Sequence, residues 1–370
     1  MLKDDQQDCN STQLTLIKWR FLMKKLLSIA VLGALGALSQ AQASVTVDIN
    51  PDGSVAGSVV NVGSLAWNVG NALSVAAAGE SITATPGSSG VNAHVGQTFS
   101  TYTMASLSAF NDVDGNGIFT NLHNTFEWTF VAGFQETFTG VNSPAGAGTN
   151  TFTVNAGTSR TATNFFEIWV DPSKNSNSLS GKGYNDGIRV LTGYFADIGR
   201  SAPGTAGSGA FTASASGAVD GSGNPLPIVQ ALDQYQSNNY LGLSTVVGNG
   251  STLVDIVVDY ANAAYFKSIP ANLTLNFTSQ QKLAFDQTNP AACFWTGSAY
   301  MNGAGGVDCA GNGDSVGTVG RLNGVSGPNV MLQTQATNNF DGTYVPEPGS
   351  LALLGLGCVA LGAMRRKTVN

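Results

Sequence analysis

Three side chains that carry oxygen atoms stand at every second position of one glycine-containing stretch: Asp112, Asp114 and Asn116. Calcium loops of the EF-hand type supply ligands from positions 1, 3 and 5, followed by a backbone carbonyl at position 7. Ile118 stands at that seventh position. The spacing therefore predicts a structural Ca²⁺ site held by the three side chains and the Ile118 carbonyl. A turn of Asp, Asn and Gly that holds no metal is the alternative, and both interpretations stay open.

The same region contains carboxylates that could serve a different chemistry. A complete calcium loop has a bidentate Glu at position 12, which here is His123, so Glu127 is the candidate to complete the site. A glycosidase takes its acid and base from a pair of carboxylates. The residues to consider for such a pair are Glu127, Glu136, Glu167 and Asp171. Carboxylates that are solvated or cap turns look the same in a sequence, so we expect that the protein is not an enzyme.

Trp169 stands between two of these carboxylates, Glu167 and Asp171. An exposed aromatic ring flanked by carboxylates can stack on a sugar ring, which would make this strand part of a carbohydrate-binding surface. The alternative is that this face of the strand packs inside a second layer of the fold. The sequence leaves both interpretations open.

A nucleophile pattern also occurs in the chain. Residues 313–317 read Gly-Asp-Ser-Val-Gly, which matches the G-x-S-x-G elbow of serine hydrolases. The elbow needs a strand before it, a helix after it and a His later in the chain, whereas His94 and His123 both precede it. We therefore expect no serine hydrolase.

The cysteines predict one disulfide. Cys9 and Cys358 fall in terminal segments that carry processing signals, which leaves Cys293 and Cys309 as an even pair in an exported chain. A bridge between them would close a loop of about 15 residues and contribute about 3 kcal/mol in the chain-entropy model. Two free thiols are the alternative.

The elements that position these residues are short β-strands. From residue 44 onward, apolar and polar side chains alternate over runs separated by Gly, Ser, Asn and Pro, which is typical of half-buried antiparallel strands. In the clearest run, Phe126, Trp128 and Phe130 share one face. The expected strands are 44–49, 102–110, 125–131, 134–138, 151–154, 164–171, 188–195, 253–260 and 273–278. The predicted fold is all-β, an antiparallel β-sandwich or jelly roll, with a weak helix signal only at 261–267.

Composition agrees with an exported protein. Only 11% of the residues are charged, against about 25% in typical globular domains, while 42% are hydrophobic. Between Ser44 and Val345 there are 8 Lys and Arg residues and 19 Asp and Glu residues, a formal charge of −11. This acidic body disfavours nucleic acid as a partner and is compatible with calcium or a neutral polysaccharide.

The front of the chain predicts a secretory signal peptide. Met23 begins a Met-Lys-Lys run, residues 26–38 are apolar, and Ala41 and Ala43 fit a small-x-small cleavage pattern. Residues 1–22 include acidic residues, Asp4, Asp5 and Asp8, where the start of a signal peptide should be basic, so we expect Met23 to be the true start. The predicted organisation is a leader at 1–43, a mature β-rich domain at 44–345 and a sorting signal at 346–370.

The tail consists of a rigid Pro-Glu-Pro break, an apolar run at 351–363 and a basic end, in that order. A helix of that run spans about 20 Å, which is short for a hydrocarbon core of about 30 Å. The predicted C-terminal transmembrane helix is therefore a marginal, transient anchor, and its basic end stays in the cytoplasm. The residues of the break and the basic end are Pro346, Glu347, Pro348, Arg365, Arg366 and Lys367.

This tail resembles the PEP-CTERM sorting signal of Gram-negative bacteria, in which the motif, the apolar segment and the basic end follow one another. The resemblance implies export, transient anchoring in the inner membrane, and processing by exosortase at or near the motif. It also implies a cell that makes exopolysaccharide, and a final location at the cell surface or in the extracellular matrix.

Five runs of the body carry a second resemblance: 131–140, 164–172, 183–193, 237–250 and 317–328. Through them the body resembles the flocculation-associated PEP-CTERM protein family. This implies a surface or matrix protein that supports flocculation or biofilm formation with exopolysaccharide or neighbouring cells as partners, and it supplies no catalytic residues. The alternative is a secreted carbohydrate-binding or carbohydrate-active protein, either a calcium-stabilised lectin-like module or a glycoside hydrolase.

Overall fold

The computed structural model describes the strands of the unit formed by residues 42–345. The described residues are 44–52, 58–82, 93–119, 126–141, 149–216, 245–268, 271–279, 291–303, 309 and 328–341. Among them there is no helix, and so none that is long and apolar enough to cross a membrane. The predicted signal helix and C-terminal helix lie outside these residues.

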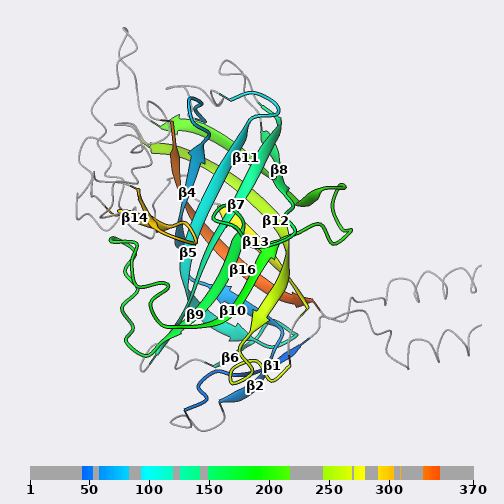
Figure 1. Ribbon diagram of the computed structural model, residues 1–370, viewed down its shortest axis with the longest axis vertical. Coiled ribbons are helices and arrows are strands. Elements are labelled where there is room, and N and C mark those ends of the chain that lie inside the picture. Colours follow the sequence, from blue (N-terminus) through cyan, green and yellow to red (C-terminus); the bar gives the residue numbers. More distant parts are fainter. Residues whose placement is uncertain are drawn as a thin grey trace, which may run out of the picture. The chain divides into compact units, whose positions relative to one another are not determined.

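The described part of the chain contains sixteen strands (Figure 1). They are β1 (Val45–Asp48), β2 (Val59–Val62), β3 (Ser64–Trp67), β4 (Gly70–Ala76), β5 (Thr98–Asn111), β6 (Gly117–Phe119), β7 (Glu127–Gly140), β8 (Asn150–Asn155), β9 (Phe165–Asp171), β10 (Ile188–Phe195), β11 (Thr205–Ser216), β12 (Thr245–Ala261), β13 (Asn272–Ser279), β14 (Cys293–Trp295), β15 (Tyr300–Asn302) and β16 (Val330–Asp341).

One large antiparallel sheet closes on itself. The sheet forms two closed rings of strands, one at each end, and five strands belong to both rings: β5, β7, β12, β13 and β16. At one end the ring is completed by β4, β8 and β11, and at the other end by β3, β9 and β10. Within both rings, each of the long strands is therefore paired with a neighbour on either side.

The period-two alternation explains which side chains enter the closed sheet. Along β7, Trp128 and Phe130 point into the apolar core, whereas Glu127 and Thr129 point outward. The same alternation places Phe166 of β9 and Ile256 of β12 in that core. The alternation that predicted the strands therefore also predicted their inner face correctly.

The end of the sheet formed by β3, β9 and β10 is filled with large side chains. Trp67, Phe110, Trp128 and Phe130 are all nearly fully buried there, with Trp67 and Phe130 packed edge to face at 4.8 Å between ring centroids. The β1–β2 hairpin covers this end, since its apolar side chains join the same core and the indole nitrogen of Trp128 donates to the carbonyl of Ile49 at 3.3 Å. Figure 1 draws β1 and β2 beside β6 at this end.

A second apolar cluster lies on the outer side of the sheet. Tyr102 of β5 and Phe165 of β9 point outward into it, where Tyr184 and Phe294 cover them. These covering residues belong to two irregular stretches, the β9–β10 connection and the segment that contains β14 and β15. Part of the outer face is therefore buried in the way that a second layer would bury it.

The predicted all-β, antiparallel class is confirmed. A sandwich or jelly roll has two sheets that pack against each other. Here the core strands belong to one sheet, and opposite sides of that sheet face each other across the core. The runs predicted at 125–131 and 134–138 form the single strand β7. The weak helix signal at 261–267 was wrong, because the backbone there makes one turn, with the amides of Tyr265 and Phe266 both donating to the carbonyl of Asn262.

Candidate functional site

A charged and aromatic group of side chains on the outer face is the best-organised polar site in the described part of the chain. We call it the Trp169 cluster; its members are Arg160, Glu167, Trp169, Arg189 and Asp259. Glu167 and Trp169 lie two positions apart on β9, so they share its outer face. The register places Arg189 of β10 directly opposite Trp169, and β12 carries Asp259.

Glu167 is the centre of the cluster. Its Oε1 accepts hydrogen bonds from Nη1 of Arg189 at 3.3 Å and from Nη1 of Arg160 at 3.4 Å. Its Oε2 accepts a hydrogen bond from the indole nitrogen of Trp169 at 3.2 Å. Only 5% of the Glu167 side chain is exposed. Burial raises the pKa of this carboxyl, and the guanidinium of Arg189, the Trp169 hydrogen bond and the guanidinium of Arg160 act in the opposite direction.

The arginines extend the cluster toward the solvent. The guanidinium of Arg189 lies over the Trp169 ring, 5.7 Å from its centroid, in cation–π geometry. Arg160 donates through Nε to Asp259 at 2.8 Å, and Thr192 donates to the other oxygen of Asp259. Both carboxylates are thus engaged by donors, which suits them to hold the arginines and the indole in place. An orderly arrangement of aromatic ring, guanidinium and carboxylate can bind polar groups without performing a reaction.

The other candidate carboxylates lie outside the Trp169 cluster. Glu127 and Asp171 face each other in the register of β7 and β9. Glu127 accepts hydrogen bonds from the amide and hydroxyl of Ser176, and Asp171 accepts one from the amide of Ser173 at 2.7 Å. Both therefore hold the start of the β9–β10 connection against the sheet. Glu136 points to the interior, away from the others.

The calcium candidates form a tight turn between β5 and β6. The Asp112 carboxylate accepts hydrogen bonds from the amides of Asp114 at 2.9 Å and Asn116 at 2.8 Å, and these bonds together with the Asn116 side chain lower its pKa. Gly115 occupies the positive-φ position of the turn. Ile118 is half-buried against the core. Within the described residues no group of three or more His, Cys, Asp and Glu side chains is arranged around a common point that could hold a metal. Calcium binding remains a prediction.

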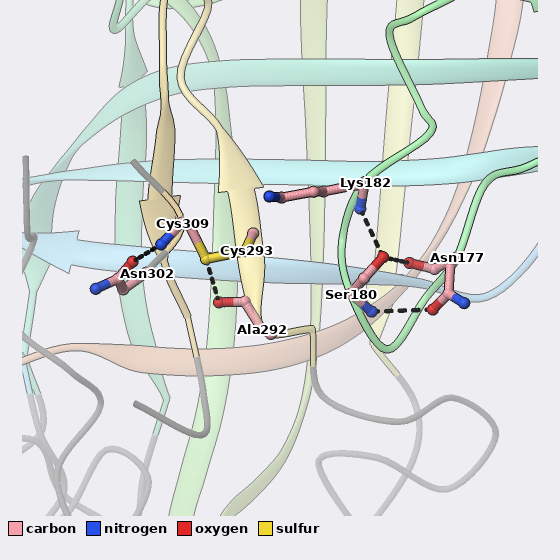
Figure 2. Close-up of a disulfide and its surroundings, with 7 residues drawn as sticks. All are labelled: Asn177, Ser180, Lys182, Ala292, Cys293, Asn302 and Cys309. Carbon is pink, nitrogen blue, oxygen red and sulfur yellow. Dashed lines mark hydrogen bonds between the residues drawn. A yellow bond between two sulfur atoms is a disulfide. The ribbon is translucent and has the colours of Figure 1, made fainter. Parts of the chain in front are cut away.

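Cys293 and Cys309 form a disulfide, with their Cα atoms 5.7 Å apart (Figure 2). The amide of Cys309 donates to Oδ1 of Asn302 at 2.7 Å, which ties residue 309 to β15. Figure 2 shows the turn that contains Asn177, Ser180 and Lys182 beside the bridge. The disulfide therefore fixes the segment that covers the outer apolar cluster.

The sequence singled out Trp169 and Glu167 but missed their partners Arg160, Arg189 and Asp259. These partners come from three separate stretches, and only the strand register brings them together. The predicted cleavage residues Ala41 and Ala43 lie outside the described residues, as do the six residues of the Pro-Glu-Pro break and the basic end.

Comparison with known proteins identifies the tail. Residues 345–367 match the family model of the PEP-CTERM protein-sorting motif, so the predicted sorting signal is confirmed. The motif implies a protein that is exported and sorted to the surface or extracellular space by exosortase. No curated protein and no solved structure matches the chain significantly.

Proposed function

We propose that this PEP-CTERM protein is a non-enzymatic component of the cell surface or extracellular matrix that supports flocculation or biofilm formation together with exopolysaccharide. The sorting motif at residues 345–367 carries the proposal, because it directs the body out of the cell. The resemblance of five runs of the body to the flocculation-associated family supplies the role.

The build of the body supports a binding rather than a catalytic role. The sheet is closed, the outer segment is held by a disulfide, and the carboxylates of Glu127, Glu167 and Asp171 accept hydrogen bonds from donors of the chain itself. A glycoside hydrolase instead needs two carboxyl groups about 5 to 9.5 Å apart on either side of a bound sugar. We assign the protein no reaction.

The Trp169 cluster is the part of the surface that we propose for contact with polysaccharide. A sugar ring presents C–H groups that stack on an aromatic face and hydroxyl groups that hydrogen-bond to carboxylate and guanidinium groups. The cluster offers Arg189 and Asp259, whose side chains are 43% and 30% exposed, beside Trp169, which is half-buried against the outer apolar cluster. This observation also favours the second candidate, a carbohydrate-binding module without an aggregating role.

Localisation and aggregation test the main proposal. A tag within the body should be found outside wild-type cells and accumulate in the membrane fraction of cells that lack exosortase. A strain without this protein should flocculate less, measured by the settling rate of the culture. Normal settling in the deletion strain would count against the flocculation role while leaving the sorting step intact.

Binding variants separate the two candidates. Trp169→Ala and Arg189→Ala should weaken binding of the purified body to the host exopolysaccharide by about tenfold, measured by sedimentation with the polymer. Leu253→Ala is the matched control, because Leu253 is 55% exposed on the same sheet and outside the cluster. If the cluster variants lose binding to polysaccharide while the deletion strain settles normally, the protein is a carbohydrate-binding module rather than an aggregating factor.

A further inference from the structure

The interior of the closed sheet is hollow at the end formed by β4, β8 and β11. The cavity there measures about 120 Å³, and all eight strands of that ring contribute to its lining. The hollow follows from side-chain size. Where the opposite end has Trp67, Phe110 and Trp128, this end has Ala72 and Ser74 on β4 and threonines on β5.

Phenylalanine rings form a large part of the apolar wall of the cavity. Phe99, Phe138 and Phe152 pack together on one side, with 4.8 Å between the centroids of Phe99 and Phe138, and Phe134 and Phe277 pack at 5.5 Å on another. An apolar cavity of about 150 Å³ in another protein stays dry and binds benzene. The size and lining of this cavity therefore suit one apolar ring.

Among the described residues, the carboxyl of Glu136 on β7 is the one ionisable group that lines the cavity. It is only 3% exposed, and no described Lys, Arg or His side chain lines the cavity with it. Within the described part of the chain its one hydrogen-bond partner is Thr101 of β5, whose hydroxyl in turn lies 2.8 Å from that of Ser74. Burial raises the pKa of Glu136 to about 8, so at neutral pH the carboxyl keeps its proton and can donate it in a hydrogen bond.

We propose that this cavity binds a small uncharged molecule, about the size of one aromatic ring, whose hydroxyl or carbonyl oxygen accepts a hydrogen bond from Glu136. The aromatic rings take the apolar part of the ligand, and the carboxyl of Glu136 fixes its orientation, since specific polar groups orient the ligand in small-molecule sites. Carboxylates and other anions are excluded, because no cation among the described lining residues would compensate their charge. The site is distinct from the Trp169 cluster, which lies on the other side of the sheet.

Three ring compounds of nearly equal size test the proposal at pH 6 on the mature chain: benzyl alcohol, toluene and benzoate. Binding is measured by saturation-transfer NMR and by the shift in melting temperature. Benzyl alcohol and toluene should bind and benzoate should not. In Glu136→Leu, benzyl alcohol should bind about tenfold more weakly and toluene at least as well, whereas Glu136→Gln, which keeps a donor, should retain benzyl alcohol.

A variant that fills the cavity provides a second test of the proposal. Ala72→Leu adds three carbons at a residue that lines the cavity, so it should abolish binding of both uncharged compounds. Ser108→Leu adds the same side chain at an exposed position of β5 and should leave binding unchanged. The proposal is overturned if neither uncharged compound binds, if benzoate binds as tightly as benzyl alcohol, or if Glu136→Leu weakens both uncharged compounds equally. If Ala72→Leu does not fold, the binding results of Glu136→Leu and Glu136→Gln still test the proposal.

Discussion

Glu136 should make the stability of the body depend on pH. Burial raises the pKa of its carboxyl from the ordinary 4.5 to about 8. Between those two pH values the unfolded chain has lost this proton while the folded protein still holds it. The free energy of unfolding therefore falls as the pH rises above about 4.5, by about 1.4 kcal/mol per pH unit from this group alone, and the fall ends above about pH 8.

The variant Glu136→Gln isolates this contribution, because Gln fits the same space and does not titrate. The free energy of unfolding of variant and wild type is measured by urea denaturation at pH 5 and at pH 8. The difference, variant minus wild type, should increase by about 3 to 4 kcal/mol between the two conditions, in favour of the variant at pH 8. Asp114→Asn is the control, since it removes one carboxylate from an exposed turn. A difference that stays constant from pH 5 to pH 8 would refute the reasoning and show that Glu136 is ionised in the folded protein.

Three further predictions follow from the outer segments and the β5–β6 turn. Reducing the disulfide between Cys293 and Cys309 should lower the free energy of unfolding by about 3 kcal/mol, measured by denaturation with and without reductant. Gly181→Ala should destabilise the protein by about 1–3 kcal/mol more than Gly199→Ala in the same assay. Both glycines have positive φ, but only at residue 181 would a new Cβ meet backbone, the carbonyl oxygen of Cys293 at 1.8 Å. Millimolar Ca²⁺ should raise the melting temperature if the Asp112 turn binds it, and Asp114→Ala should remove that rise; an unchanged melting temperature contradicts calcium binding.

The sequence predicted those strands in which large apolar side chains alternate with polar ones. The run at 188–195 coincides with β10, and the inner faces of β7, β9 and β13 were identified correctly. The short strands β2, β3, β6, β14 and β15 were missed, and so were the longer strands β4, β11 and β16. The inward positions of these longer strands include small or polar residues such as Ser74, Gly209 and Thr334, which give no amphipathic signal.

Closure of the sheet and the composition of both sites depend on contacts that no local pattern encodes. Glu167 and Arg189 are 22 residues apart in sequence, and Arg160 and Asp259 are 99 apart. Glu136 was considered only as one member of an acid–base pair. Its burial follows from β5, β8 and the far wall of the ring closing around β7, and this is what changes its chemistry from that of a surface carboxylate to that of a neutral donor.

The unequal filling of the two ends has an energetic consequence that supports a binding role for the hollow one. Unfilled space beside core side chains reduces stability, because the side chains that line it lose packing contacts. Larger side chains at positions such as Ala72 and Ser74 would recover part of that free energy, as Trp67 and Phe110 do at the opposite end. A buried carboxyl in the same cavity lowers the stability at neutral pH further, because the unfolded chain gains by ionising it. Both features oppose stability in the same small volume, and both are what a pocket for an uncharged, oxygen-bearing ring would require.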